Sequence, residues 1–216
     1  NGSMYLAWSK PTEHNTLQYP GPYRYLIYRG EQNTSNLQLI DSTLSINDTT
    51  YIDTLINTQN FQYFYKIDIY SVPNASSRSY MGSSVVSSSN YLNLIPSDNQ
   101  LTLVWNEAVP WTNTEHVIYR LNTTTQVYDS IGIINATNFV DTGLVNLRTY
   151  CYLVKSIGAY SAPGTINPIV NFSQKSCGQP IDNIAPCPPE LCVEIDCELQ
   201  NNLLHWTNYN PGCADD

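Results

Sequence analysis

The stretch Asn138–Lys155, which reads N-F-V-D-T-G-L-V-N-L-R-T-Y-C-Y-L-V-K, decides the fold of this chain. Its alternating apolar residues around an Asp-Thr-Gly turn predict a short strand, a corner and a longer strand. A second copy lies at Thr50–Lys66 and reads T-Y-I-D-T-L-I-N-T-Q-N-F-Q-Y-F-Y-K. Two copies about ninety residues apart indicate a repeated structural unit.

The Asp-Thr-Gly turn is also a candidate active site, because aspartic proteases carry the same tripeptide. The first copy has Leu55 where the second has Gly143, so only the Asp-Thr pair and the later Tyr-x-Tyr are common to both. We therefore interpret the stretch as scaffold, with Asp53 and Asp141 as turn residues whose side chains cap their own backbone. Calcium binding is the alternative for these carboxylates, but no oxygen-cage spacing supports it.

Tryptophans mark equivalent positions along the chain. Trp8, Trp105 and Trp206 each end a run in which apolar and polar residues alternate. Because alternation buries one face of a strand, we expect all three to be core residues.

The repeat divides the chain into three units. The first spans 1–90 and lacks its first strand, the second spans 91–184, and 185–216 is the incomplete start of a third. The expected linkers between them are Ser87–Asn90 and Asp182–Pro189, of which the Pro-rich second is the stiffer. Short strands with turns every 8–12 residues or so, and no sustained helical period, predict an all-β chain of tandem immunoglobulin-like β-sandwiches.

Composition excludes several classes of partner. Lys and Arg total 9 against 18 acidic residues, which gives a net charge of −9 without a basic stripe. Binding to nucleic acid or to an anionic membrane is therefore not expected. No apolar run approaches the roughly 18 residues of a membrane span. Because the chain opens inside a strand-like run, we expect it to be an interior part of a longer protein, and the missing signal peptide is uninformative.

Cysteine usage points to an oxidising compartment. The six cysteines all lie in the C-terminal third, at positions 151, 177, 187, 192, 197 and 213. In a chain with few lysines this pattern favours disulfides, for which 15 pairings exist in principle. Zinc binding by Cys187, Cys192 and Cys197 with the nearby His205 is the alternative, but the cysteine spacing is longer than usual in zinc sites.

The repeated unit resembles the fibronectin type III domain. The resemblance rests on the Trp of the second strand and on the turn-Leu and Tyr-x-Tyr pattern before the sixth strand. It implies that Tyr63 and Tyr150 are tyrosine corners, whose hydroxyls bond to nearby backbone. It also makes the strands that carry Cys151 and Cys177 neighbours, so we expect these two residues to form a disulfide.

The four cysteines of the third unit are harder to pair. Cys197 and Cys213 bracket its second strand and are the next disulfide candidates. Cys187 and Cys192 then remain, and they pair either with each other or with cysteines outside this sequence. Each bridge would stabilise its unit by about 2–4 kcal/mol.

A narrower resemblance is to the tandem modules of Bacteroidetes surface proteins. It is carried by V-W-N-E-A-V-P-W, V-I-Y-R, F-V-D-T-G-L, T-Y-C-Y-L-V-K-S-I-G-A-Y-S, I-A-P-C-P-P and L-H-W-T-N-x-x-P-G-C-A-D-D. Such proteins often end in a gliding-motility-associated sorting domain of the type 9 secretion system. The resemblance implies export across the outer membrane of a Gram-negative bacterium, display at the cell surface or release, and protein partners there.

The sequence offers no candidate catalytic, cofactor or metal residues, so we do not expect an enzyme. The three histidines stand at non-equivalent positions of the repeat, and neither a G-x-S-x-G elbow nor a repeated carboxylate pair occurs. A glycan is a second class of partner for the aromatic-rich strands, although Tyr63, Tyr65, Tyr150 and Tyr152 have the spacing of core or corner residues. The Bacteroidetes resemblance also suggests covalent O-glycans on Asp-Ser/Thr sites. The candidate O-glycan acceptors are Ser42, Thr49, Thr54 and Ser130.

The function expected from these observations is structural. The units would form a stalk, or an adhesive and docking surface, in an exported cell-surface protein. Two alternatives remain: accessory modules of a secreted hydrolase, and a component held by protein contacts in the type 9 secretion or gliding machinery. A catalytic domain in the full-length gene would favour the first alternative, and co-purification with translocon components would favour the second.

Overall fold

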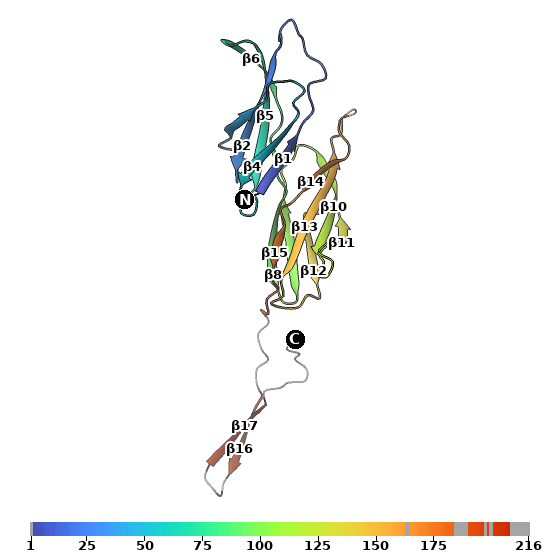
Figure 1. Cartoon of the computed structure of the whole chain (residues 1–216). Coiled ribbons are helices and arrows are strands. Elements are labelled where there is room, and N and C mark those ends of the chain that lie inside the picture. Colours follow the sequence, from blue (N-terminus) through green and yellow to red (C-terminus); the bar gives the residue numbers. More distant parts are fainter. Residues whose placement is uncertain (1, 163–164, 184–189, 197, 199–200, 208–216) are drawn as a thin grey trace.

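The computed structural model describes residues 2–162, 165–183, 190–196, 198 and 201–207. Within them the regular structure consists of strands, without a helix. Figure 1 shows two sandwiches, made by β1–β7 and β8–β15, followed by the hairpin β16–β17. The predicted all-β fold of tandem immunoglobulin-like sandwiches is confirmed by the strand order.

The first sandwich consists of a two-stranded and a five-stranded sheet. In the smaller sheet, β1 (Gly2–Ala7) pairs antiparallel with β4 (Thr50–Ile56). The larger sheet has the order β3-β2-β5-β6, with β7 also beside β5. Its strands are β2 (Tyr23–Glu31), β3 (Gln38–Ser42), β5 (Tyr63–Asn74), β6 (Ser77–Ser83) and β7 (Ser87–Ser88).

The second sandwich repeats this plan and adds one strand. Its smaller sheet has the order β12-β9-β8, and its larger sheet the order β11-β10-β13-β14 with β15 also beside β13. The added strand is β8, which has no counterpart in the described part of the first sandwich. The strands are β8 (Tyr91–Ser97), β9 (Gln100–Asn106), β10 (Thr112–Leu121), β11 (Tyr128–Ile134), β12 (Asn138–Thr142), β13 (Tyr150–Ala159), β14 (Ile169–Phe172) and β15 (Ser176–Gly178).

Alternation along the strands builds the two cores. On β9, Leu101, Leu103 and Trp105 point inward and are buried. They meet Tyr152 and Val154, which alternate in the same way on β13. The core of the second sandwich is therefore formed by the alternating apolar residues from which the strands were predicted.

The first sandwich has the same pattern: Ile56, Tyr63 and Tyr65 form a buried cluster, and Tyr25 and Ile27 of β2 are buried as well. Met4 and Leu6 on β1 pack against this core and are only half-buried. Trp8 is also half-buried, and its ring meets that of Tyr25 edge-on at 5.4 Å between centroids. Trp105 is thus the only one of the three expected core tryptophans that is fully buried in its sandwich.

The segment Ser87–Asn90, the expected short linker, is paired and largely buried. Ser87 and Ser88 form β7 and pair with Tyr65 and Phe64 of β5. Ser88, Ser89 and Asn90 are buried. The segment leads directly from the larger sheet of the first sandwich into β8, because its backbone finds partners in both sandwiches.

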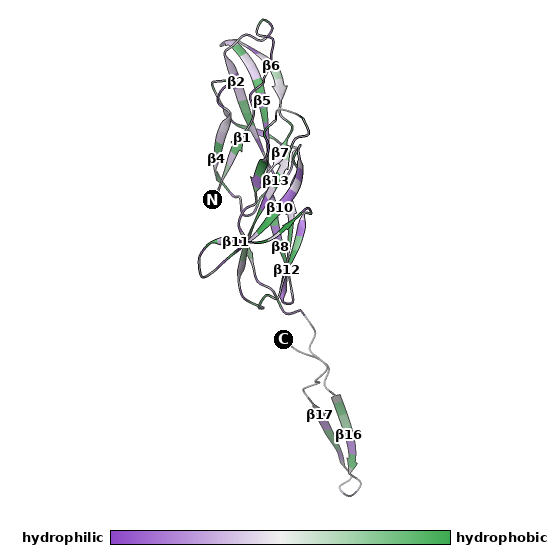
Figure 2. Ribbon diagram, turned by 90° about the vertical axis from the view of Figure 1, so that its right-hand side faces the viewer, coloured by the Kyte–Doolittle hydropathy of each residue, from purple (hydrophilic) through white to green (hydrophobic). Residues whose placement is uncertain are grey.

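The third expected unit is represented by β16 (Glu190–Asp196) and β17 (Asn201–Thr207), an antiparallel hairpin. Leu191 faces Trp206 and Val193 faces Leu204 across it, and Figure 2 shows hydrophobic residues on both strands. Trp206 is 62% exposed, which corrects its assignment as a core residue. No second sheet covers this apolar face within the described residues. The expected linker Asp182–Pro189 lies largely outside them.

The described residues contain no helix that is long and apolar enough to cross a membrane.

Candidate functional site: the junction between the sandwiches

An Arg-Asp-Tyr cluster recurs inside each sandwich. In the first, Arg29 Nη1 donates to Asp53 Oδ1 and Oδ2 at 2.9 and 3.0 Å. The Tyr65 hydroxyl donates to Asp53 Oδ2 at 2.9 Å. The buried carboxylate is thus held by side chains from β2 and β5, in the facing sheet.

The second sandwich builds the same cluster from Arg120, Asp141 and Tyr152. Arg120 Nη1 lies 3.1 and 2.8 Å from the two oxygens of Asp141, and the Tyr152 hydroxyl donates at 2.8 Å. These contacts correct the interpretation of Asp53 and Asp141 as turn caps. Both lie within strands, β4 and β12, and bond across the sandwich instead of to their own backbone.

The surroundings of the cluster keep its tyrosine protonated. Burial raises the pKa of the Tyr65 phenol, and the neighbouring charge of Asp53 raises it further. Burial and the hydrogen bond to Asp141 raise the pKa of Tyr152 in the same way. Each phenol therefore stays a donor, and each carboxylate is satisfied by a cation and a hydroxyl. The arrangement ties two sheets together and offers no free nucleophile.

The two tyrosines expected at corners accept hydrogen bonds from nearby backbone. Asn57 N donates to the Tyr63 hydroxyl at 3.1 Å. Val145 N donates to the Tyr150 hydroxyl at 3.0 Å. Each bond spans the turn between the smaller and the larger sheet, which is where a tyrosine corner acts.

The expected disulfide between Cys151 and Cys177 is confirmed, with an S–S distance of 2.04 Å. It joins directly opposed residues of β13 and β15. Cys187, Cys197 and Cys213 lie outside the described residues, so the Cys197–Cys213 pairing and the partner of Cys192 stay predictions. Across the described part of the chain, no three His, Cys, Asp or Glu side chains gather as metal ligands would.

The junction between the sandwiches is a second polar site rich in hydrogen bonds, and we define it as Gln62, Ser88–Asn90 and Asn106–Ala108. Gln62 Nε2 lies 3.1 Å from Ser88 Oγ, 2.9 Å from Ser89 O and 3.1 Å from Asn106 O. One side chain of the first sandwich thus contacts the connecting segment and the end of β9 in the second.

Ser88 makes the second set of contacts across the junction. Its backbone N donates to Ala108 O at 2.8 Å, and Ala108 N donates back to Ser88 Oγ at 2.7 Å. The Tyr91 hydroxyl adds a bond to Gln59 O at 3.1 Å. Ser88 therefore belongs to the sheet of one sandwich while its polar groups bond to the other.

A buried polar chain continues from the junction into the second sandwich. Asn90 Nδ2 donates to Ser156 Oγ at 2.7 Å, and Ser156 Oγ donates to Glu107 Oε2 at 2.8 Å. Glu107 Oε1 lies 3.1 Å from His116 Nε2. Although Ser, Glu and His meet here, Ser156 bonds to the carboxylate and not to the imidazole. Ser156 is also fully buried, so a substrate could not reach this series of hydrogen-bonded side chains.

The residues considered as a carbohydrate platform are partly inside the protein. Tyr63, Tyr65 and Tyr152 are buried and fill the sandwich cores. Sequence reasoning found these tyrosines but missed Gln62 and Ser88. The only sign of these two residues in the sequence was their position, because both lie at the ends of strands that the repeat predicts to pair.

Comparisons with known proteins give structural likenesses only. No protein-family model matches the chain, and no curated protein matches it. The central fibronectin-III array of RIM-binding protein is similar at 15% identity over 97% of this chain and 75% of that chain, with a TM-score of 0.31.

Two further solved structures have the same TM-score. Chicken interferon gamma receptor alpha chain, in selenomethionine-substituted form, is 14% identical over 82% of this chain and 91% of that chain, with a TM-score of 0.31. The FN1–FN3 domains of chicken CNTN1 are 9% identical over 83% of this chain and 60% of that chain, also at 0.31.

Proposed function

We propose that the chain is a non-catalytic spacer, in which the junction fixes the angle between two sandwiches and so sets the reach of a longer exported protein. The observation that carries this proposal is the bonding of Gln62 and Ser88 to both sandwiches. A flexible tether would need no such contacts. Each hydrogen bond contributes about 1 kcal/mol, so several together oppose bending at this point.

An extracellular, cell-surface location is part of the proposal. The Cys151–Cys177 disulfide persists in oxidising compartments and is rarely kept in the cytosol. The resemblance to Bacteroidetes surface modules suggests the outer surface of a Gram-negative cell, with protein partners there. Deleting residues 1–183 from the full-length protein should then shorten the reach of its distal part without preventing its secretion.

The angle between the sandwiches can be tested in solution. Residual dipolar couplings of the full chain are expected to give one alignment tensor for both sandwiches. Replacing Gln62 with Ala and Ser88 with Ala together removes the side-chain contacts across the junction, and the two tensors should then differ in magnitude.

A matched control is Gln179→Ala, which removes an exposed Gln amide that donates to Thr149 Oγ1 inside the second sandwich. This variant should leave the common tensor unchanged. Two clearly different tensors in the unmodified chain would show that the junction is flexible and would refute the spacer proposal. Binding of partners by an otherwise flexible chain would then favour the docking alternative.

A further inference from the structure

The end of the second sandwich that carries its corner tyrosine differs in charge from the same end of the first. A cavity of about 460 Å³ lies there, between the turn after β10 and the turn after β12. Two of the chain's nine Lys and Arg residues line it, Arg120 and Arg148, in a protein whose net charge is −9. Asn122–Thr124, Asp129 and Tyr150 form the rest of its polar wall.

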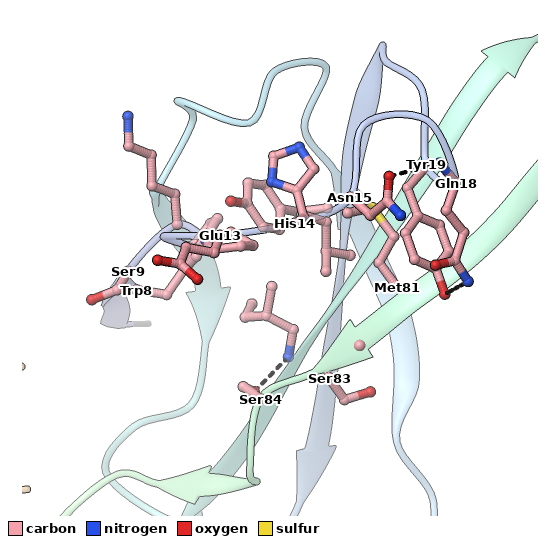
Figure 3. A pocket seen from close by; sticks show the side chains of 16 residues that line it. Trp8, Ser9, Glu13, His14, Asn15, Gln18, Tyr19, Met81, Ser83 and Ser84 are labelled. Atoms are coloured by element: carbon pink, nitrogen blue, oxygen red, sulfur yellow. Dashed lines mark hydrogen bonds between the residues drawn. The ribbon is translucent and has the colours of Figure 1, made fainter. Parts of the chain in front are cut away.

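The cavity of about 510 Å³ in the first sandwich has a different chemistry. Figure 3 shows Trp8 and Glu13 on its wall, and the ring of Tyr25 lines it as well. Lys10 is the only Lys or Arg among its lining residues. A cavity with two guanidinium groups is therefore particular to the second sandwich.

Arg148 is the first group of this cavity that is open to a ligand. Its guanidinium carbon lies 5.7 Å from the centre of the Tyr150 ring, and the residue is exposed. None of the ion pairs within the described residues includes it. Arg120, by contrast, is already held by Asp141. The cavity thus presents one guanidinium without a carboxylate, beside a tyrosine.

The hydroxyl of Tyr150 is the second such group. Its oxygen accepts from Val145 N at 3.0 Å, but its own proton has no acceptor among the described residues. Asn122 is bound within its own turn, because its Oδ1 accepts from Thr124 N at 3.0 Å and its Nδ2 donates to Asp129 Oδ2 at 2.9 Å. The phenol proton therefore faces the cavity wall without competition from this amide.

In the first sandwich a glutamate of the chain itself reaches the corner tyrosine. The Tyr63 hydroxyl lies 3.5 Å from Glu31 Oε2, and the two residues stand opposite each other across β2 and β5. The first copy of the repeat therefore shows which group this corner accepts, namely a side-chain carboxylate.

The register of the strands makes Asn122 the counterpart of Glu31. Arg29 and Arg120 occupy equivalent places, since each stands opposite the cluster tyrosine of its own sandwich. Glu31 follows Arg29 by two residues, and Asn122 follows Arg120 by two. The second copy thus has no carboxylate of its own at this place.

Two further differences favour an anion at the same place. Arg148 stands two residues before its corner tyrosine, where the first sandwich has Phe61, an apolar residue that packs against the core. Gly143 lines the cavity, and its counterpart is Leu55. Compared with the first copy, the second has therefore lost a carboxylate, gained a guanidinium and lost a side chain from the wall.

We propose that this cavity binds the side-chain carboxylate of an acidic segment on a partner protein. Arg148 supplies the positive charge, and the Tyr150 hydroxyl donates a hydrogen bond where Tyr63 meets Glu31 in the first sandwich. Guanidinium and carboxylate match in geometry and form charge-assisted hydrogen bonds. The site docks a partner on the second sandwich and does not depend on the angle that the junction sets.

The probe is a short peptide of Gly and Ser around one Glu, acetylated and amidated so that the side chain carries its only charge. Amide chemical shifts of the full chain are followed as the peptide is added. The amides of Gly143, Val145 and Arg148 should shift, and the same peptide with Gln in place of Glu should leave them unchanged. Equal shifts with both peptides would overturn the proposal.

A third peptide distinguishes a side chain from a chain end. It carries Gln at the central position and a free C-terminal carboxylate. If this peptide bound and the amidated Glu peptide did not, the site would recognise a chain terminus, and the assignment to an acidic side chain would be wrong.

Arg148→Met should weaken binding of the Glu peptide roughly tenfold, because a charged donor is lost. The matched control is Arg78→Met, which removes another exposed arginine that lies over a tyrosine ring, that of Tyr70 at 4.7 Å. The control changes the net charge equally and should keep the affinity. Equal affinities of the two variants would show that Arg148 is not the binding group.

A second pair of variants returns the carboxylate of the first copy to the second. Asn122→Glu should weaken peptide binding as strongly as Arg148→Met, because the new side chain occupies Arg148 from within the chain. Asn122→Gln loses the same contacts in the turn without adding a charge, and it should bind the peptide like the unmodified chain. Equal affinities of these two variants would contradict the place assigned to the carboxylate.

Discussion

The two sandwiches share strand order, Arg-Asp-Tyr cluster and tyrosine bonds, yet the inward-facing residues of β1 and β9 differ in burial. Leu103 and Trp105 of β9 are 0% and 1% exposed, whereas the equivalent Leu6 and Trp8 are only half-buried. The difference coincides with β8 and with the segment that precedes it. One strand along an edge therefore decides whether the facing residues of the neighbouring strand are half-buried or fully buried.

The comparison separates what belongs to the repeat from what is particular to one copy. Asp53 and Asp141 have the same partners and belong to the repeat. The disulfide does not, because Phe64 and Ser88 occupy the paired positions in the first sandwich. Substitutions can test each assignment, since a repeated feature should respond equally in both copies.

The largest expected effect is loss of the disulfide, which is particular to the second sandwich. Replacing Cys151 and Cys177 with Ala should destabilise that sandwich by about 3–4 kcal/mol, as expected for a bridge that closes a 26-residue separation. The loss of stability is measured by urea unfolding, with hydrogen exchange of the backbone amides used to monitor each sandwich separately. Comparable loss of protection in β2 and β5 would show that the sandwiches unfold as one body.

Removing the cation of the repeated cluster should have the next largest effect. Arg120→Met leaves the Asp141 carboxylate with the Tyr152 hydroxyl alone and should cost about 2–3 kcal/mol. Arg29→Met should cost a similar amount in the first sandwich, because Asp53 has the same partners. Chemical denaturation of both variants is the measurement. A cost confined to one of them would show that the cluster is not a property of the repeat.

Alkaline pH should weaken both sandwiches through the cluster tyrosines. Above their ordinary pKa of 10.0, tyrosines of the unfolded chain release protons that Tyr65 and Tyr152 still hold when folded. The unfolded state then binds fewer protons, so stability falls as the pH rises beyond about 10. Tyr152→Phe should lose less stability between pH 8 and pH 11 than the unmodified chain. If the stability of Tyr152→Phe depended on pH in the same way as that of the unmodified chain, Tyr152 would not be the source of the pH dependence.

The smallest effect concerns the turn after the repeated Asp-Thr pair. Leu55 has a φ of 62° and Gly143 a φ of 69°, a region that favours glycine. Leu55→Gly should stabilise the first sandwich by about 0.5–1 kcal/mol, since Leu55 is 81% exposed and its side chain contributes little packing. The reciprocal Gly143→Leu should destabilise the second. Thermal unfolding of the pair of variants checks the signs.

The sequence was sufficient for the architecture because alternation and the repeat act locally. It identified the strands that carry Trp105 and Tyr152, and the resemblance to fibronectin type III domains implied that Cys151 lies next to Cys177. It could not assign Asp53 and Asp141, because a carboxylate in an Asp-Thr dipeptide suits a turn as well as a strand. Their partners come from a facing sheet, and only the packed sandwich shows which arginine reaches them.

The junction was missed for a related reason. Ser87–Asn90 is small and polar, which is typical of a linker. Its burial depends on Gln62 and Ala108, which lie in other segments and have no distinctive motif. Trp206 is the opposite case. The alternation predicted its strand correctly, but its side chain can be buried only by a second sheet, and the pattern of one strand does not supply that sheet.

The direct passage from β7 into β8 has a mechanical consequence. Tension applied along the chain would reach Ser88 while it is paired with β5, and would reach Leu92 while it is paired with β9. The same short segment therefore transmits load into both sandwiches.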